Sequence, residues 1–214
     1  MIYSHIGQFA FVHIHKCGGE SIEFAFDQIS KPSDFILGGT EWSERLQKRY
    51  VERFKLRKHS VSDRIADSFQ GLITPHFHFY VLLRDPIDRA ISTFYYFKKW
   101  GYDLAKPFDN PSDFWLSDKV NWHGPDFFFL AQHKFLPLKH KSINTKIYLL
   151  EDIALMVDDM NKLLTPLGYE EMAALHRNSG NYQQKVGLNE KAKLYIQNRY
   201  SEDFKLIASI KHDK

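Results

Sequence analysis

The sequence predicts an α/β protein with a mainly parallel central sheet flanked by helices. Three apolar runs have the length and composition of buried strands: residues 8–14, 78–84 and 145–152. Each run is followed by a segment in which apolar residues recur at helical spacing. Strands that alternate with helices in this way are typical of sheets whose neighbouring strands run parallel.

The first strand and its helix are joined by a glycine turn. The run "QFAFVHI" (8–14) is mostly apolar, and "ESIEFAFDQIS" (20–30) places Ile22, Phe26 and Ile29 on one helical face. Two adjacent glycines stand between them and predict a tight turn. The opening unit is therefore strand, turn, helix.

The second and third strands repeat the pattern. "HFYVLLR" (78–84) leads into "DPIDRAISTFYYFKKW" (85–100), where Pro86 stands at a position that suits the start of a helix. "TKIYLLED" (145–152) leads into "IALMVDDMNKLL" (153–164), which is helical in period.

Two further helices are expected, over residues 46–54 and over residues 189–210, the latter beginning at Asn189. The first lies in a basic run, residues 45–58, which holds seven Lys or Arg and one acid, Glu52. Such a run is usually a solvated helix face, but it would also favour an anionic acceptor.

The chain of 214 residues is long enough for one domain with a substantial core, and we expect residues 1–214 to form a single domain. A net charge of +3 is too small to indicate nucleic-acid binding. Cys17 is the only cysteine, which excludes an internal disulfide and a multi-cysteine zinc site. We find no apolar run long enough to span a membrane and no leader pattern, so a cytoplasmic protein is expected.

The loop "HIHKCGGES" (13–21) has the features of an anion site. It follows a buried strand, and ligands of parallel sheets bind beyond the carboxyl ends of the strands. Gly18 and Gly19 permit a tight turn, the amides of the next helix attract an anion, and Lys16 adds a positive charge. A Walker loop would place its lysine after the second glycine, whereas Lys16 precedes both. Glycine turns of this kind are also common scaffolding.

A second anion site is predicted after the second strand. Arg84 stands at the carboxyl end of that strand, and Ser92 follows eight residues later inside the predicted helix. A guanidinium and a hydroxyl at this spacing suit a phosphate. Two anion sites at neighbouring strand ends fit a ligand that carries phosphates at two positions.

The two motifs together resemble those of sulfotransferases that use 3′-phosphoadenosine-5′-phosphosulfate (PAPS). "HIHKCGGES" is similar to the 5′-phosphosulfate loop of that family, and "RDPIDRAISTFYYF" is similar to its 3′-phosphate element. The most similar branch is the heparan 2-O-sulfotransferase-like group, which acts on carbohydrate hydroxyls. The resemblance implies a P-loop-like three-layer fold without a metal. This chain departs from the family in having His15 in place of proline and Glu20 in place of threonine.

The resemblance also implies a division of roles. Lys16 would offset the charge that develops on the departing phosphate of an in-line transfer, whose product is 3′,5′-adenosine bisphosphate. Arg84 and Ser92 would bind the 3′-phosphate. The backbone of five loop residues would bind the 5′-phosphate: Cys17, Gly18, Gly19, Glu20 and Ser21.

The transfer needs a base for the acceptor hydroxyl, and histidine suits that task near neutral pH. His59 lies between the two motifs in a context similar to the family's, so it is the first candidate, with His13 and His15 in reserve. His76 and His78 are rejected because, at about 3.3 Å per strand residue, His78 lies roughly 20 Å from the ligand end of its strand.

Other interpretations stay open. Glu20 would repel a phosphosulfate, which favours a degenerate nucleotide-binding module without transfer activity. The main rival enzyme is a nucleotide kinase with a P-loop-like fold. The paired histidines at 13/15 and 76/78 would suit a metal-dependent hydrolase. Cys17 could be a reactive thiol. Three tryptophans are candidates for stacking on a sugar: Trp100, Trp115 and Trp122. The segment "HRNSGN" (176–181) weakly resembles a family segment near the nucleotide.

Overall fold

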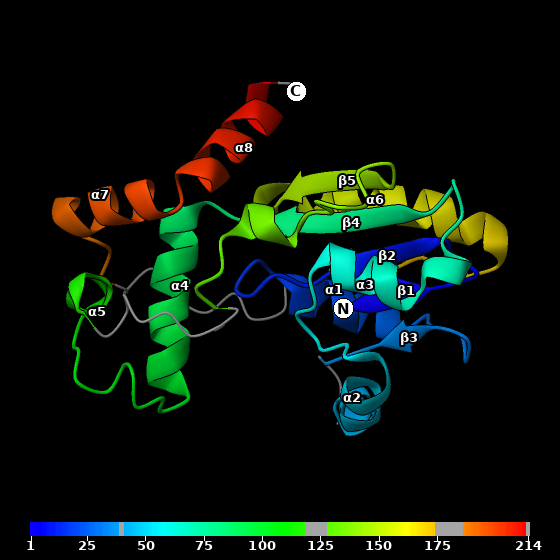
Figure 1. The fold of residues 1–214 in the computed structure, drawn as a ribbon, viewed down its shortest axis with the longest axis horizontal. Coiled ribbons are helices and arrows are strands. Elements are labelled where there is room, and N and C mark those ends of the chain that lie inside the picture. The colour runs from blue at the N-terminus through cyan, green and yellow to red at the C-terminus, as the bar shows by residue number, and fades with distance from the viewer. Residues whose placement is uncertain (39–40, 119–127, 174–185, 213–214) are drawn as a thin grey trace. The chain divides into compact units, whose positions relative to one another are not determined.

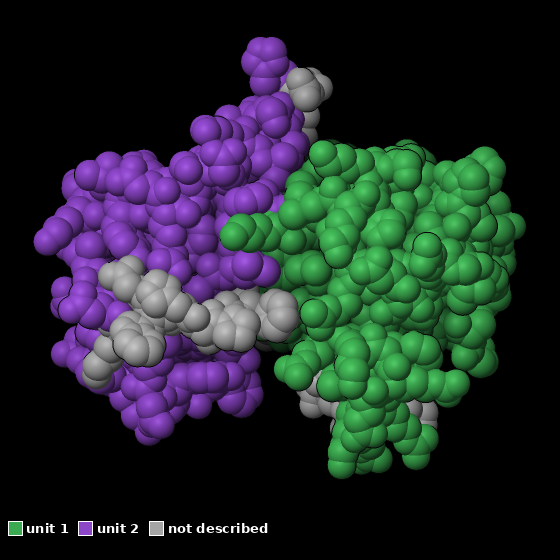
Figure 2. All heavy atoms as spheres, in the orientation of Figure 1, with its two compact units in different colours: residues 1–83, 134–178 green, residues 84–133, 179–214 purple. Residues whose placement is uncertain are grey.

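The computed structural model describes residues 1–38, 41–118, 128–173 and 186–212. Contacts divide the chain into two compact units, coloured separately in Figure 2. Unit 1 comprises residues 1–83 and 134–178, and unit 2 comprises residues 84–133 and 179–214. The single domain over residues 1–214 stays a prediction.

Unit 1 is built on a five-stranded sheet with the order β3-β1-β2-β4-β5 (Figure 1). The strands are β1 (Ile2–Ser4), β2 (Phe9–Val12), β3 (Phe35–Ile36), β4 (His78–Leu83) and β5 (Asn144–Leu149). β4 pairs in parallel with both β2 and β5, and Val12 lies opposite Val81. β1 pairs antiparallel with β2 and with β3. The predicted α/β class is confirmed, but the sheet is mixed and only partly parallel, because the two short strands β1 and β3 add antiparallel pairings.

The helices of unit 1 flank this sheet. They are α1 (Gly19–Asp27), α2 (Glu41–Phe54), α3 (Ser62–Ser68) and α6 (Ile153–Leu164), with short 3-10 turns at Gln70–Leu72, Leu150–Asp152 and Thr165–Leu167. A further 3-10 turn, Gln132–Phe135, spans the chain position at which unit 2 ends and unit 1 resumes. The apolar sides of α1 and α6 pack on one face of the sheet, through Ile22, Phe26, Met156, Val157 and Met160. β5 ends three residues before the predicted boundary, because the 3-10 turn begins at Leu150.

A carboxylate on α6 links that helix to the sheet. Asp159 Oδ2 accepts hydrogen bonds from Lys146 Nζ at 2.7 Å, Tyr148 OH at 2.9 Å and Tyr80 OH at 3.0 Å. Burial opposes ionisation of Asp159, but these three donors outweigh it and hold the pKa of Asp159 below its ordinary value. The group is therefore charged at neutral pH and well bonded.

Unit 2 is helical in the part that the structure describes. Its helices are α4 (Pro86–Lys99), α5 (Pro111–Leu116), α7 (Glu190–Arg199) and α8 (Ser201–His212). α4 begins as predicted, because Asp85 caps it by accepting from the amides of Ile87 and Asp88, and Pro86 occupies the first turn. The single closing helix that was predicted is two helices, interrupted at Tyr200.

The core of unit 2 is aromatic. It gathers side chains of α4, α5 and α7, among them Phe94, Phe97, Phe114, Trp115 and Ile196. The indole Nε1 of Trp115 donates to the carbonyl of Ala90 at 3.0 Å, so its one polar atom is satisfied inside the core. The high aromatic content of the sequence is therefore partly explained by this cluster.

We expect Asp159→Asn to lower the free energy of unfolding by roughly 1–3 kcal/mol at pH 7, the scale of hydrogen bonds to a charged group. Because the pKa of Asp159 is depressed on folding, its contribution exists above the unfolded pKa of 3.8 and is lost as pH falls through the folded pKa. Urea unfolding should therefore show a difference between the two proteins that shrinks below about pH 4.

The matched control is Asp158→Asn, which removes the neighbouring exposed carboxylate and should change stability by less than about 0.5 kcal/mol. Equal effects of the two variants at pH 7, or a difference that grows toward low pH, would contradict this role of Asp159.

Candidate functional site

The loop from β2 to α1 contains a lysine in an unusual backbone conformation. φ is 63° at Lys16 and 83° at Gly18. Glycine adopts such angles readily, whereas a lysine there is uncommon and costs roughly 1–3 kcal/mol. Strained residues of this kind cluster at functional positions. Lys16 is half-buried and is therefore partly accessible to a ligand.

Packing requires both glycines of the loop. A Cβ on Gly18 would lie 2.5 Å from Leu150 Cδ1, and a Cβ on Gly19 would lie 2.4 Å from His13 Cδ2. The imidazole of His13 thus packs directly on the first residue of α1. The "GG" pair is explained by the local structure, whether or not the loop binds an anion.

The loop amides are not equivalent. The amide of Cys17 donates to Ile14 O at 3.4 Å, and the amide of Ser21 donates to Gly18 O at 3.0 Å. A phosphate that accepted hydrogen bonds from the amides of Cys17 and Ser21 would have to replace the carbonyl oxygens that now accept from them. Gly19 is the first residue of α1, and the first amides of a helix have no acceptor one turn earlier, so the amide of Gly19 is a candidate to bind an anion. The Cys17 thiol is buried and donates to His15 O at 3.5 Å, which makes a reactive thiol a poor interpretation.

Glu20, the main departure from the family pattern, is an exposed ion-pair partner. Its Oε1 lies 3.5 Å from Lys58 Nζ, and that nitrogen also lies 3.8 Å from Glu23 Oε2. An exposed pair of this length adds little stability. Its consequence is electrostatic, because Lys58 offsets the negative charge that Glu20 brings to the loop.

Three histidines meet beside the loop. The rings of His59 and His15 stack with centroids 3.2 Å apart, and His13 lies edge-on to His59 at 4.6 Å. His59 Nδ1 is 2.9 Å from the carbonyl oxygen of His13. A carbonyl only accepts, so Nδ1 carries the hydrogen and Nε2 carries the lone pair in the neutral ring. Burial lowers the pKa of His59 well below 6.5, and His13 adds to this effect. The predicted base is therefore held neutral, in one tautomer.

His13 is itself anchored by a buried carboxylate. Its Nδ1 donates to Glu23 Oε1 at 2.7 Å, and the same oxygen accepts from the amino group of Met1 at 2.5 Å. Burial lowers the pKa of His13 well below its usual value, and the charges of the Met1 amino group, Lys58 and Lys16 lower it further. His13 is thus held neutral, with its ring fixed by Glu23.

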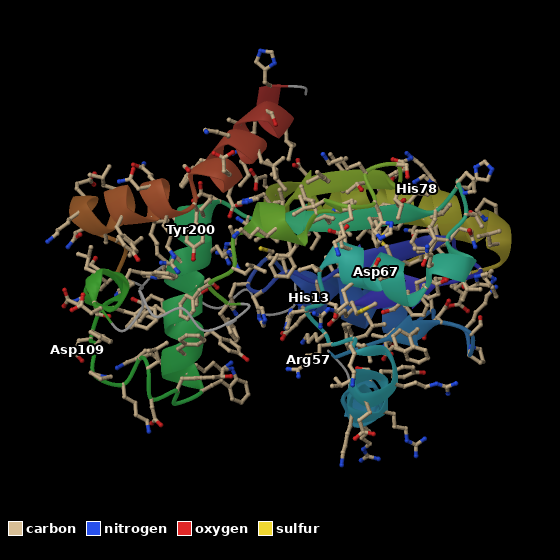
Figure 3. The ribbon with its side chains drawn as sticks, in the orientation of Figure 1. His13, Arg57, Asp67, His78, Asp109 and Tyr200 are labelled. Carbon is tan, nitrogen blue, oxygen red and sulfur yellow. The ribbon has the colours of Figure 1, made fainter. Side chains whose placement is uncertain are left out.

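The rejected histidines lie away from this cluster. His78 is the first residue of β4, and Figure 3 shows it at the end of the sheet opposite to His13. His76 is exposed just before the strand. Their exclusion as bases stays a prediction.

Arg84 and Ser92, the predicted contacts of a 3′-phosphate, belong to unit 2. The side-chain amide of Gln132 brackets the backbone of Arg84: its Oε1 accepts from Arg84 N at 2.9 Å and its Nε2 donates to Arg84 O at 2.8 Å. The backbone that carries the guanidinium is therefore fixed. Ser92 lies on α4 and only 3% of it is exposed. Of the two, Arg84 is the more accessible.

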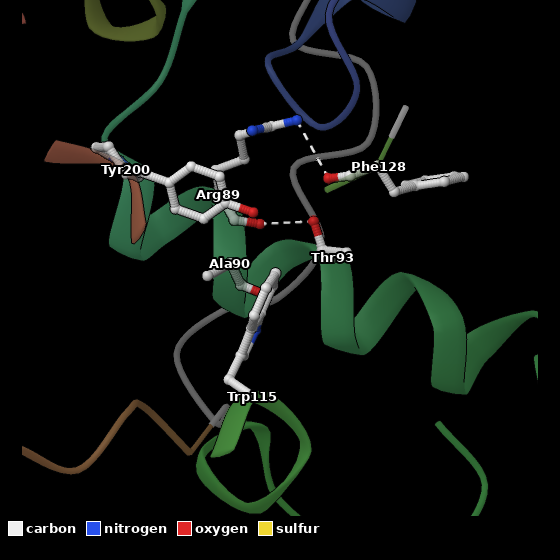
Figure 4. Close-up of a pocket in the computed structure, with 7 residues that line it drawn as sticks. Arg89, Ala90, Thr93, Trp115, Phe128 and Tyr200 are labelled. Carbon is white, nitrogen blue, oxygen red and sulfur yellow. Dashed lines mark hydrogen bonds between the residues drawn. The ribbon is translucent and has the colours of Figure 1, made fainter. Parts of the chain in front are cut away.

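The second arginine of the motif, Arg89, has a structural role. It is buried, and its guanidinium donates to Leu130 O at 3.0 Å and to Phe128 O at 3.2 Å. Figure 4 shows it beside Tyr200 at a small hollow that Thr93 and Trp115 also line. Since Arg89 is engaged by backbone carbonyls, it holds the segment 128–130 against α4.

The remaining candidate residues differ in how far their side chains are exposed. Trp100 is 63% exposed and can stack on a sugar, whereas Trp115 is buried in the core of unit 2, so its assignment to sugar stacking is wrong. Trp122 and the segment 176–181 lie outside the described residues. The basic run contributes an exposed set of cations on α2 and just after it: Arg45, Lys48, Arg49, Arg53, Lys55 and Arg57.

Among the residues described, no three His, Cys, Asp or Glu side chains are grouped so as to hold a metal ion. Within the same ranges, none of the helices has the length and apolar character needed to cross a bilayer.

Comparison with known proteins identifies no relative. No protein-family model matches the chain, and neither a curated protein nor a solved structure matches it significantly.

We expect Gly19→Ala to destabilise unit 1, because the new methyl group would overlap the His13 ring. Overpacking of this kind costs typically about 1–3 kcal/mol of unfolding free energy, which thermal unfolding would detect. Gly71→Ala is the control, since nothing lies within 4 Å of its Cβ position. If the two variants unfold at the same temperature, His13 does not pack on Gly19.

We expect the imidazole of His59 to remain neutral at pH 6.5, with its hydrogen on Nδ1, because its pKa is lowered and His13 O accepts from Nδ1. Nitrogen-15 NMR of the histidine rings would report both properties, and His59→Asn would identify the resonances. A ring that is half protonated at or above pH 6.5, or that carries its hydrogen on Nε2, would contradict this geometry.

Proposed function

We propose that this protein is a PAPS-dependent sulfotransferase with a P-loop-like three-layer fold, which transfers a sulfuryl group to a hydroxyl of a carbohydrate-type acceptor. The observation that carries the proposal is the bond from His59 Nδ1 to His13 O. It leaves the lone pair of Nε2 for an acceptor proton, in the same unit as the strained Lys16 loop. A base and an anion-binding loop are what such a transfer requires of a protein.

The proposed mechanism assigns one task to each residue. His59 Nε2 takes the proton as the acceptor oxygen bonds to sulfur and the bond from sulfur to the bridging phosphate oxygen breaks. Lys16 offsets the negative charge that grows on that bridging oxygen. The amide of Gly19 binds the 5′-phosphate at the start of α1. The products are the sulfated acceptor and 3′,5′-adenosine bisphosphate.

Arg84 supports the assignment of a second phosphate. It is the residue that follows Leu83, the last residue of β4, and β4 is the parallel neighbour of β2. The carboxyl ends of parallel neighbours share one edge of a sheet. Along the chain, the Lys16 loop follows β2 and Arg84 follows β4. We assign the 3′-phosphate to Arg84 first and to the buried Ser92 second.

The rival interpretations have less support. Glu20 favoured a degenerate module, but its charge is offset by Lys58. A nucleotide kinase would require a lysine after the second glycine, where Glu20 and Ser21 stand. A carbohydrate acceptor fits the exposed cations of the basic run and the exposed Trp100.

We expect 3′,5′-adenosine bisphosphate, at 100 times its dissociation constant, to stabilise the protein by about 2.7 kcal/mol, with ATP giving a smaller effect. Thermal unfolding with each nucleotide measures this difference.

We expect Lys16→Ala and His59→Ala each to lose most of the transfer activity. Transfer is measured from labelled PAPS to a panel of neutral and acidic polysaccharides.

His76→Ala is the matched control, since this exposed histidine lies away from the cluster. It should leave both stabilisation and transfer unchanged. No stabilisation by saturating 3′,5′-adenosine bisphosphate rules out the nucleotide, and full transfer by His59→Ala rules out His59 as the base.

A further inference from the structure

A buried carboxylate in unit 2 holds two consecutive residues that the mechanism does not use. Asp203 of α8 is fully buried. Its Oδ2 accepts from the amide of Gln132 at 2.7 Å, and its Oδ1 accepts from the amide of His133 at 2.8 Å. A buried carboxylate is stable only when its oxygens are well bonded, and here backbone amides satisfy both.

The same carboxylate orients the ring of His133. Asp203 Oδ1 lies 2.8 Å from His133 Nδ1, so Nδ1 carries a hydrogen and donates it to the carboxylate. The side chain of His133 is 29% exposed although its Nδ1 faces a fully buried partner. Nε2, at the other side of the ring, is therefore the atom that can meet a ligand. A histidine backed by a carboxylate in this way is oriented for one further contact.

Gln132 connects this histidine to the predicted phosphate contact. Its backbone amide is held by Asp203, and its fully buried side chain brackets both backbone groups of Arg84. Arg84 and His133 are thus fixed through one buried residue, although they are 49 positions apart in the chain (133 minus 84). Two side chains that are suited to anions are set on one rigid frame within unit 2.

We propose that His133 is a second ligand of the anion that Arg84 binds, which under the proposed function is the 3′-phosphate of the nucleotide. In its doubly protonated form, the His133 ring donates Nε2–H to a phosphate oxygen and Nδ1–H to Asp203, which fixes the ring from the opposite side. Arg84 and the imidazolium of His133 would each make a charge-assisted hydrogen bond to the phosphate. Nothing in the local sequence "LAQHKF" marks this role, because it depends on Asp203.

The test uses a pair of ligands that differ only in the 3′-phosphate: 3′,5′-adenosine bisphosphate and adenosine 5′-phosphate. We expect His133→Ala to weaken calorimetric binding of the bisphosphate roughly tenfold or more, the effect of one hydrogen bond to a charged group, and to leave binding of the monophosphate unchanged. His133→Gln keeps an N–H donor near the Nε2 position and should recover part of the affinity. His140→Ala is the control, because His140 is a similarly exposed histidine paired with a carboxylate, Asp67, in unit 1.

The outcomes separate this inference from the proposed function. If the wild-type protein binds both ligands equally, or neither, the nucleotide assignment fails. If it prefers the bisphosphate but His133→Ala weakens both ligands alike, or weakens neither, the His133 contact is refuted. Should His133→Ala not fold, nitrogen-15 NMR of the wild-type ring decides: Nε2 should shift with the bisphosphate and not with the monophosphate, and no selective shift refutes the contact.

Discussion

The packing of the His13 ring against Gly19 is the constraint on which the candidate site of unit 1 depends. A side chain at position 19 would overlap the ring, so α1 must begin with glycine at that point. The ring is held from the other side by Glu23, which lies one turn further along α1. The backbone carbonyl of the same histidine then fixes the tautomer of His59. One residue thereby sets the start of the helix and the protonation state of the proposed base.

This arrangement explains how His13 and His59 remain neutral beside several cations. Lys16 and Lys58 carry positive charge near the rings, and burial also disfavours imidazolium, so the pKa values of His13 and His59 both fall. A base that must accept a proton near neutral pH has to be neutral beforehand. Burial within unit 1 keeps the His59 ring neutral, but the same lowering of its pKa makes it a weaker base.

In unit 2, too, a buried carboxylate supports a candidate ligand contact. Here Asp203 is the buried carboxylate, and it fixes Gln132, which in turn fixes the backbone of Arg84. In each unit a buried acid anchors a residue that supports a candidate ligand contact: Glu23 anchors His13, and Asp203 anchors Gln132. Rigid support of this kind determines how well a binding residue is positioned.

The sequence predicts the elements that pattern alone determines. β2 and β4 were predicted because they are continuous apolar runs, and α4 because Asp85 and Pro86 mark its start. β1 and β3 have three and two residues, too few for any periodicity, and they make the sheet mixed. The break at Tyr200 lies inside an unbroken helical pattern, so tertiary packing decides it.

The site was predictable only in part, for a related reason. Lys16, Gly18 and Gly19 are visible as a motif, but the bonds from His59 to His13 and from Gln132 to Arg84 join residues more than forty positions apart. Local spacing carries no information about such pairs. Trp115 was predicted wrongly for another reason. Tryptophan is a residue type that can stack on a sugar, but the fold buries Trp115 in the core of unit 2.

A crystal structure of the protein with 3′,5′-adenosine bisphosphate would show most directly whether the two motifs bind one nucleotide. The 5′-phosphate should lie at the amide of Gly19 with Lys16 beside it, and the guanidinium of Arg84 should bind the 3′-phosphate. A nucleotide that contacts the loop without Arg84, or that binds elsewhere, would contradict the claim that the two motifs hold the two ends of one ligand.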